Sequence, residues 1–318
     1  MAIRPYARLA IVLLFLALGL SACDRNVDHR LSIAMNDWTG YQPLVYASEL
    51  GILDRKQVHL ATLGSTTESL QQFRAGTVDA VTVTLDEALL LLAEGYDISL
   101  VLLMDVSNGA DAIVAQSGIQ TLKQLKGKRV GVENTAVGAY VLTRAMAQAG
   151  LTVNDINTLP ISAHEQIRYF ESHRVDAVVT FEPMKSQLVQ HGGRVVFDSS
   201  MIAGEIVDVL VVKRECLEQD AAQIQHVIDA WFKALDHIQY NKNESIQWFG
   251  RSQKLDALTT KSMLDEIHFP DRKENRERLG PNGSIHQSVD KLTEIMLQHE
   301  LLPRRPDSSR LIYNGFVK

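Results

Sequence analysis

Residues 73–81 read Phe-Arg-Ala-Gly-Thr-Val-Asp-Ala-Val, and residues 170–178, 97 positions later, read Phe-Glu-Ser-His-Arg-Val-Asp-Ala-Val. In each copy an amphipathic helical pattern ends at the phenylalanine and a tight turn follows. A short apolar run, 81–85 or 178–181, then has the pattern of a buried parallel strand. A helix–turn–strand unit that occurs twice predicts two similar α/β lobes. A chance match of four residues is the alternative, and the matching phenylalanine and predicted elements favour the repeat.

Strand-like and helix-like segments alternate along most of the chain. Strands are predicted at 31–35, 58–63, 81–84, 98–104, 112–115, 130–132, 157–161, 177–181, 192–197 and 207–212. This alternation predicts an α/β protein with two doubly wound, mostly parallel sheets. The chain is expected to cross to a second lobe near residue 113 and to return near residue 207. Lobe 1 then comprises residues 31–113 plus 207–318, and lobe 2 comprises residues 114–206.

Helical patterns dominate from residue 221 to the C-terminus, and we predict no sheet-forming run there. A helical C-terminal extension of lobe 1 is therefore expected. The charged run 271–278 predicts either a rim of the binding site or a solvated loop.

The N-terminus has the layout of a secretory signal. Arg4 and Arg8 precede an apolar run at 9–20, which is too short for a comfortable membrane span. Small residues before Cys23 resemble the bacterial lipobox, which implies a signal peptide at 1–22, a tether at 23–30, and acyl chains such as palmitate on Cys23. The alternative is an ordinary cleaved signal with an incidental cysteine. Asp24 resembles the signal that retains lipoproteins at the inner membrane.

The net charge limits the possible binding partners, and the cysteine content limits the possible disulfides. The formal net charge is −6, and because residues 1–22 hold two of the 32 basic residues and no acidic ones, the mature chain carries 30 basic and 38 acidic residues, a net charge of −8. A chain this acidic has no general affinity for nucleic acid. With Cys23 acylated, Cys216 is the one remaining thiol, so no intrachain disulfide is expected.

Signatures of catalysis and of metal binding are weak. His164-Glu165 and His286 lack the His-Glu-x-x-His spacing of a zinc site. Ser199 and Ser200 lack the glycines of a hydrolase nucleophile elbow. We therefore expect no enzymatic activity, no cofactor and no metal.

Several motifs together resemble a known family. These are the lipobox, the Trp38-x-Gly-Tyr41 turn, the Leu-Lys-Gly-Lys-Arg-Val-Gly-Val run at 125–132 and the paired Val-Asp-Ala repeats. In order and spacing, residues 31–215 resemble the solute-binding proteins of nitrate, sulfonate, taurine and thiamine-precursor ABC importers (SsuA/THI5-like). The resemblance implies a type II-like periplasmic-binding-protein fold and a monomer that closes on one small solute and docks on an ABC permease. It also implies a location at the periplasmic face of the inner membrane.

Candidate ligand residues in lobe 1 follow predicted strands, where open α/β sheets bind their ligands. Trp38 and Tyr41 come after the first strand and are expected to stack on a ligand or, alternatively, to pack the first helix. Ser65 and Thr66 begin a helix, where they present hydroxyl and N–H groups to a ligand or simply cap the helix.

The repeat itself supplies two further candidates. Thr84 and Phe181 end the two equivalent strands and are expected to face each other across the cleft. Asp79 and Asp176 lie in the turns that lead into these strands, so we predict a structural role for them.

Lobe 2 and the returning strand supply the remaining candidates. Asn134, Thr135 and Ala136 open a long helix whose N–H groups suit an anion or a carbonyl oxygen, or are capped in the ordinary way. Glu182 precedes Pro183 and is either a ligand group or a neighbour of a helix cap. Asp208 lies in an apolar strand and needs a partner, either a cationic ligand or a lysine or arginine side chain.

The candidate positions collect carboxylates and almost no basic side chains. The carboxylates are Asp86, Asp105, Asp111, Glu182 and Asp208. This composition points away from nitrate and sulfonate and favours a cationic or amine-bearing small organic molecule, for example a heteroaromatic base. Exposed surface carboxylates are the alternative.

The leading hypothesis is a lipid-anchored solute-binding protein without catalysis. One alternative is a periplasmic partner that reports a ligand to a signalling receptor. Another is a thiamine-pyrimidine synthase of the same fold, although the lipobox and the absence of the cysteine-rich segment of that group disfavour it.

Overall fold

The computed structural model describes residues 29–318. The predicted signal peptide at 1–22 and the acylated Cys23 lie outside the described residues. We describe the unit Leu31–Lys318, which contains all of the named helices and strands.

The first sheet has six strands. They are β1 (Leu31–Met35), β2 (Val58–Thr62), β3 (Ala80–Thr84), β4 (Ile98–Ser107), β10 (Val207–Lys213) and β11 (Ile267–His268), in the spatial order β11-β4-β10-β3-β1-β2. β1 runs parallel to β2 and β3, whereas β10 runs antiparallel to both of its neighbours, β3 and β4. β10 is rich in valine, which suits a strand buried at the centre of a sheet.

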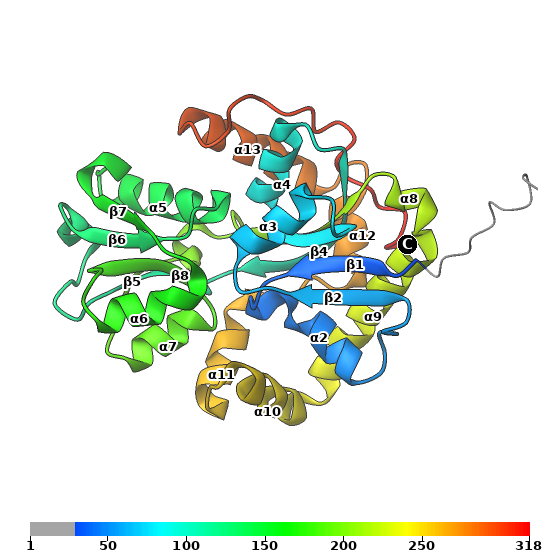
Figure 1. The fold of residues 1–318 in the computed structure, drawn as a ribbon, viewed down its shortest axis with the longest axis horizontal. Helices are drawn as coiled ribbons and strands as arrows, with labels where there is room; N and C mark the ends of the chain where they lie inside the picture. The colour runs from blue at the N-terminus through cyan, green and yellow to red at the C-terminus, as the bar shows by residue number, and fades with distance from the viewer. Residues whose placement is uncertain (1–28) are drawn as a thin grey trace, which may run out of the picture. The chain divides into compact units, whose positions relative to one another are not determined.

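The second sheet has five strands. They are β5 (Asp111–Ala115), β6 (Arg129–Val132), β7 (Asn157–Pro160), β8 (Ala177–Phe181) and β9 (Arg194–Asp198), in the order β7-β6-β8-β5-β9. β6 is parallel to β7 and β8, and β5 is antiparallel to β8 and β9. We call each sheet with its helices a lobe, and Figure 1 shows the second lobe on the left and the first on the right. The predicted two-lobed α/β class is confirmed; the exact lobe boundaries remain a prediction.

Helices cover both sheets. The longer ones are α2 (Gln42–Glu49), α3 (Thr66–Arg74), α4 (Leu85–Glu94), α5 (Ala136–Gln148), α6 (Gln166–Glu171), α7 (Met184–Gln190), α9 (Ala221–Tyr240), α10 (Lys242–Gln253), α11 (Ala257–Asp265), α12 (Arg272–Leu279) and α13 (Ser284–Gln298). α2 packs on α9, and α4 contacts both α13 and α5, so α4 and α5 join the two lobes on one side.

The C-terminal region differs from the prediction in two places. The two-residue strand β11 pairs with β4 at the edge of the first sheet, so the prediction of no sheet-forming run after residue 221 is wrong. The charged run 271–278 is the helix α12, which Asp271 caps by accepting a hydrogen bond from the Glu274 N–H at 2.8 Å. The Asn275 side chain bonds the backbone N–H and C=O of Leu103 in β4, at 2.8 and 3.0 Å, and ties α12 to the sheet.

The repeat has the same local geometry in both lobes. Asp79 accepts a hydrogen bond from the Ser32 N–H at 2.9 Å, and Asp176 accepts one from the Arg129 N–H at 2.8 Å, each across 47 residues. The aspartate N–H groups donate back to the carbonyls of the same two residues. The predicted structural role of both aspartates is confirmed, because each joins its turn to the neighbouring strand.

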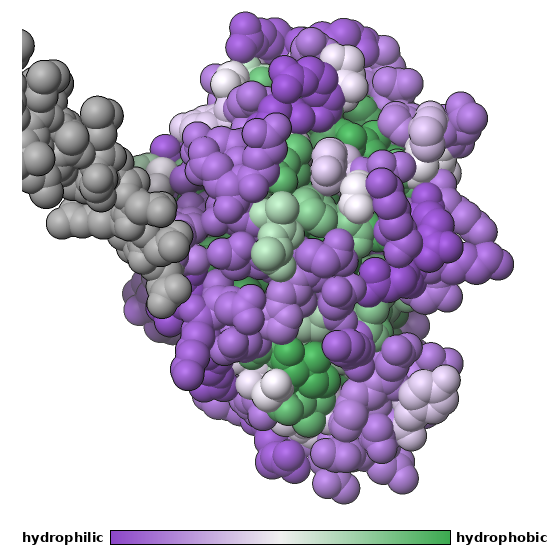
Figure 2. All heavy atoms as spheres, turned by 90° about the vertical axis from the view of Figure 1, so that its right-hand side faces the viewer, coloured by the Kyte–Doolittle hydropathy of each residue, from purple (hydrophilic) through white to green (hydrophobic). Residues whose placement is uncertain are grey.

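One face of the molecule is mainly polar (Figure 2). Figure 2 shows the face over α8 (Cys216–Gln219) and the C-terminus, where hydrophilic residues dominate and hydrophobic ones appear in small separate areas. Between residues 29 and 318, no helix combines the length and the apolar content that a membrane span requires.

Candidate functional site

Two small adjoining cavities lie between the lobes, where β1, β3 and β8 end. Each has a volume of about 20 Å³, room for about one water molecule. The first is lined by Asn36, Trp38, Tyr41, Thr66, Thr84, Glu87, Asp111, Val137, Phe181 and Asp208. The second is lined by Asp111, Glu133, Thr135, Val137, Gly138, Val141, Gln166, Val179, Thr180 and Phe181. Asp111, Val137 and Phe181 are shared, so we treat the pair as one cleft.

Larger cavities of about 220, 430 and 330 Å³ lie elsewhere on the molecule. We assign the site to the small cleft because the ends of parallel strands and buried polar side chains from both lobes meet there. Contacts across it are close: the rings of Trp38 and Phe181 meet edge to face with centroids 5.9 Å apart. Glu133 of the second lobe accepts hydrogen bonds from Thr67 N–H and Oγ1, at 3.0 and 2.8 Å. The cleft is therefore almost shut in this structure.

A tight turn after β1 orients the two aromatic side chains of the first lobe. The Trp38 N–H donates to Asn36 Oδ1 at 3.0 Å, and the chain then enters a short 3₁₀ helix, Thr39–Tyr41. A side chain at Gly40 would place its Cβ 2.0 Å from Asp105 Oδ2 and 2.2 Å from Trp38 Nε1, so only glycine fits.

Both aromatic side chains donate a hydrogen bond to a buried carboxyl. Trp38 Nε1 donates to Asp105 Oδ2 at 3.1 Å, and the Tyr41 hydroxyl donates to Asp208 Oδ1. Among residues 29–318, no lysine or arginine pairs with Asp208, although such a partner is one of the two possibilities predicted from the sequence. Both aromatics thus pack in the core and at the same time hold carboxyls at the cleft.

Five buried carboxyls lie at the cleft, four from the first lobe and one, Asp111, at the start of β5 in the second. Asp105 on β4 lies directly opposite Asp208 on β10, and Thr84 on β3 pairs with Asp208 from the other side. Asp86 and Glu87 begin α4 directly after β3, and Asp111 begins β5. None of the five carboxyl residues is more than 7% exposed. Like charges at directly opposed strand positions repel each other, so this arrangement costs stability when the carboxyls are ionised.

Burial disfavours the ionised form of every one of these groups. It raises the pKa of Asp105 and of Asp111 to about 7, and that of Asp86 to about 6. The pKa of Asp208 lies well above its usual range because of burial and then repulsion from Asp105. Burial and then Asp86 do the same to the pKa of Glu87.

Several acceptor atoms at the cleft lack a donor. Glu87 Oε2 accepts from the Thr84 N–H at 3.2 Å, but Glu87 Oε1, which is also buried, has no hydrogen-bond partner. Asp105 Oδ1, Gln166 Oε1 and Thr180 Oγ1 are in the same state. Buried polar atoms are ordinarily paired, and an unpaired one costs about 1–3 kcal/mol. These unpartnered atoms therefore make the two walls of the cleft costly in the ligand-free protein.

The structure brings most of the candidates derived from the sequence together. Trp38, Tyr41, Thr66, Thr84, Phe181 and Asp208 line the first cavity, and Thr135 lines the second. Thr84 and Phe181 end β3 and β8 and lie in the same cavity, as the repeat predicts.

The other candidates line neither cavity. Ser65 caps α3 by accepting from the Glu68 N–H at 3.2 Å. Asn134 is exposed at the start of α5, and Ala136 is buried there. A role in ligand binding for Ser65, Asn134 and Ala136 stays a prediction.

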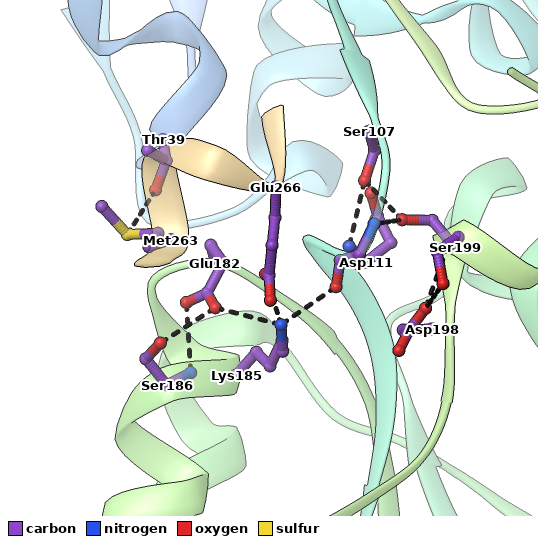
Figure 3. A network of polar contacts seen from close by, with 12 residues as sticks. Thr39, Ser107, Asp111, Glu182, Lys185, Ser186, Asp198, Ser199, Met263 and Glu266 are labelled. Atoms are coloured by element: carbon purple, nitrogen blue, oxygen red, sulfur yellow. Dashed lines mark hydrogen bonds and ion pairs between the residues drawn. The ribbon is translucent and has the colours of Figure 1, made fainter. Parts of the chain in front are cut away.

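Glu182 lies in a separate polar network at the junction of the lobes (Figure 3). It accepts from the Ser186 N–H and hydroxyl, at 3.1 and 2.9 Å, and so caps α7. Lys185 on α7 donates to the Gly109 carbonyl at 3.0 Å and to Glu266 of the first lobe, and its Nζ lies 3.5 Å from Glu182 Oε1. The network therefore links α7 of the second lobe to the first lobe. A ligand role for Glu182 remains a prediction.

The two segments that join the sheets are bonded to each other. Ser199 Oγ lies 2.8 Å from Ser107 Oγ and accepts from the Gly109 N–H at 2.6 Å (Figure 3). Further along the returning segment, Glu205 accepts from Arg144 at 2.8 Å and from the Tyr140 hydroxyl at 2.7 Å, both on α5. Lys291 on α13 donates to Glu205 at 3.2 Å, so Glu205 connects helices of both lobes.

Six further residues line the cavities without having been predicted from the sequence: Asn36, Glu87, Glu133, Val137, Gln166 and Thr180. Glu87 was detectable, because it lies three residues after Thr84, the capping-box spacing at the end of the first repeat strand. The contact of Glu133 with α3 joins two lobes and has no local signal.

The comparisons with known proteins agree with this architecture. A protein of Escherichia coli (strain K12), provisionally named as an aliphatic sulfonates-binding protein, is 23% identical over 202 residues, which cover 63% of this chain and 61% of that protein. The alkanesulfonate-binding protein SsuA of Xanthomonas axonopodis pv. citri, solved with MOPS bound, superposes with a TM-score of 0.77 at 18% identity, covering 90% of this chain and 98% of that one. The desulfurization enzyme DSZB superposes with a TM-score of 0.61 at 18% identity, covering 91% and 98%.

These structural likenesses establish the fold, which binding proteins and an enzyme share. The family comparison rests on the sequence itself and extends over both lobes and into the C-terminal helices. The profile of the NMT1-like family matches residues 25–248, so the chain belongs to the NMT1-like family.

Proposed function

We propose that this protein is an extracytoplasmic solute-binding protein that captures one small organic molecule between its lobes and delivers it to an ABC importer. The observation that carries the proposal is the cleft, where unpaired buried acceptors from both lobes face the space between strand ends. The two sheets are joined by short segments between β4 and β5 and between β9 and β10, a connection that suits closure about a hinge. The names of the similar binding proteins support the same function.

A lipid on Cys23 is part of this proposal. It would hold the protein at the periplasmic face of the inner membrane, beside the permease, where a captured solute is released. The lipobox-like sequence before Cys23 is the support for this anchor.

Binding without catalysis is the proposed mode of action. Cys216, which is buried, has a pKa raised to about 12 by burial and by its hydrogen bond to Asp220, so it is unsuited to act as a nucleophile. A sensing role would use the same cleft and closure, with a receptor in place of the permease.

The test is a thermal-shift screen of the mature protein against a broad metabolite library, followed by calorimetry on each hit. A specific solute is expected to raise the melting temperature, because it binds the folded state alone. Trp38→Ala should weaken each hit, whereas Trp248→Phe, a change outside the cleft, should not. A library in which no solute binds would overturn the proposal.

A further inference from the structure

We infer that the solute of this cleft is a small organic cation that donates several N–H hydrogen bonds, of the amine, amidine or guanidine class. The inference rests on the proposed function and adds the chemistry of the ligand. It follows from three features of the cleft: the charges that line it, the state of its donors, and the atoms left without partners.

The charges that line the cleft are negative. Glu87, Asp111 and Asp208 line the first cavity, Glu133 lines the second, and Asp105 lies directly behind Trp38. Among the residues the structure describes, no lysine or arginine lines either cavity. An anionic group here would meet carboxyl groups, and the nearby Lys185 is already bonded to the Gly109 carbonyl and to Glu266, so a sulfonate is disfavoured.

Three of the donors at the cleft are already engaged by the protein. Trp38 Nε1 donates to Asp105 and the Tyr41 hydroxyl donates to Asp208. The Asn36 amide donates to Thr66 Oγ1 at 2.6 Å. A ligand that accepts hydrogen bonds from these groups would have to displace these pairs, and the hydroxyls of Thr84 and Thr180 are the donors left for it.

The acceptors, in contrast, are available. Glu87 is 1% exposed, lines the first cavity, and holds Oε1 without a partner. Gln166 and Thr180 line the second cavity, and Gln166 Oε1 and Thr180 Oγ1 also have no hydrogen-bond partner. A ligand that brings N–H donors and positive charge satisfies these atoms and offsets the repulsion among the carboxylates.

An organic cation fits this set better than a metal ion does. Within residues 29–318, no group of three or more histidine, cysteine, aspartate or glutamate side chains has the arrangement of a metal site. The flanking rings of Trp38, Tyr41 and Phe181 provide apolar and π surfaces, which favour organic cations.

Binding of a cation is coupled to pH because the carboxyls must be ionised to hold it. The titratable and charged groups around the cleft are Tyr41, Asp86, Glu87, Asp105, Asp111, Glu133, Glu182, Lys185 and Asp208. Since burial raises the pKa of Asp105 and Asp111 to about 7, binding at neutral pH releases protons. Cation affinity should therefore fall as the pH is lowered from 8 to 5.

The test compares probes of one shape and different charge. Benzamidinium, benzamide and benzenesulfonate are titrated into the mature protein at pH 8, with acetamidinium, acetamide and methanesulfonate as a smaller set. We expect the cations to bind at least tenfold more tightly than the matched neutral amides, and the sulfonates not to bind. Calorimetry in buffers of different ionisation enthalpy should show proton release with the cations.

Variants separate recognition from folding. Glu87→Gln and Asp208→Asn should each weaken cation binding at least tenfold, while the melting temperature of the ligand-free protein at pH 8 stays the same or rises. Asp236→Asn, which neutralises an exposed carboxylate on α9, is the control and should leave the affinity unchanged.

Three results would overturn the inference: no cation binding, equal or tighter binding of the sulfonates, or undiminished cation affinity in both cleft variants. If the metabolite library then yields a neutral or anionic solute that depends on Trp38, the solute-binding function stands and the cationic ligand does not. If the library yields nothing as well, both proposals fail.

Discussion

At the scale of single residues, Asp105 and Asp208 form a pair of buried carboxyls directly opposite each other on neighbouring strands. Their pKa values are raised in the folded state, so the native protein binds more protons than the unfolded chain between about pH 4 and pH 7. The stability that these raised pKa values contribute is therefore fully present at low pH. It is lost as the pH rises through the pKa values of the folded state.

Asp105→Asn should consequently stabilise the ligand-free protein at pH 8, by at least about 1 kcal/mol, because the amide removes one charge and can donate to Asp208. The gain should shrink toward pH 5, where the carboxyls are protonated. Urea denaturation at both pH values measures it. An equal effect at pH 5 and pH 8 would show that charge repulsion is not the cause.

Gly40 is a residue whose identity is required by the local geometry. In Gly40→Ala the new Cβ would meet Asp105 Oδ2 and Trp38 Nε1 at 2.0 and 2.2 Å, so the pair must separate. We expect a loss of about 1–3 kcal/mol in unfolding free energy, together with weaker solute binding. Gly118→Ala is the matched control, since a Cβ there has no atom within 4 Å; equal losses in both variants would contradict the steric account.

At the scale of elements, Glu133 connects the second lobe to the N-terminus of α3. Its carboxylate accepts from two donors of Thr67 and lies where the helix dipole favours negative charge. Hydrogen bonds to charged groups contribute about 1.5–3 kcal/mol. Glu133→Ala should therefore shift the ligand-free protein toward an open conformation by roughly tenfold or more.

Small-angle X-ray scattering checks this shift as a larger radius of gyration without ligand. Glu68→Ala is the control, because Glu68 is at the same helix terminus but bonds Gly64 within the first lobe. A radius of gyration that is identical in both variants would rule out an interlobe role for Glu133.

At the scale of the whole molecule, the proposed anchor determines where the protein is found. Cys23→Ala should move it from the membrane fraction to the soluble fraction of the cell envelope and abolish labelling with radioactive palmitate. Cys216→Ala is the control and should remain membrane-bound. A wild-type protein that is soluble and unlabelled would exclude the anchor.

The sequence was most informative where structure is local and repeated. The two Val-Asp-Ala-Val units predicted the ends of β3 and β8 and the structural role of Asp79 and Asp176, because the same chain geometry needs the same residues. The sequence did not predict β11, because two residues carry no periodicity. It did not predict α12 either, because the charged sequence of this helix has no apolar face. Contacts between lobes, such as that of Glu133, depend on the completed fold and leave no local pattern.

The position of β10 has a consequence for how the protein is made. β10 separates β3 from β4, so the first sheet stays in two pieces until residues 207–213 are available to pair. The second sheet, by contrast, uses only residues 111–198 in one uninterrupted stretch. The lobe encoded in the middle of the gene can therefore complete its sheet first, and the lobe that contains the beginning of the sequence must wait for it.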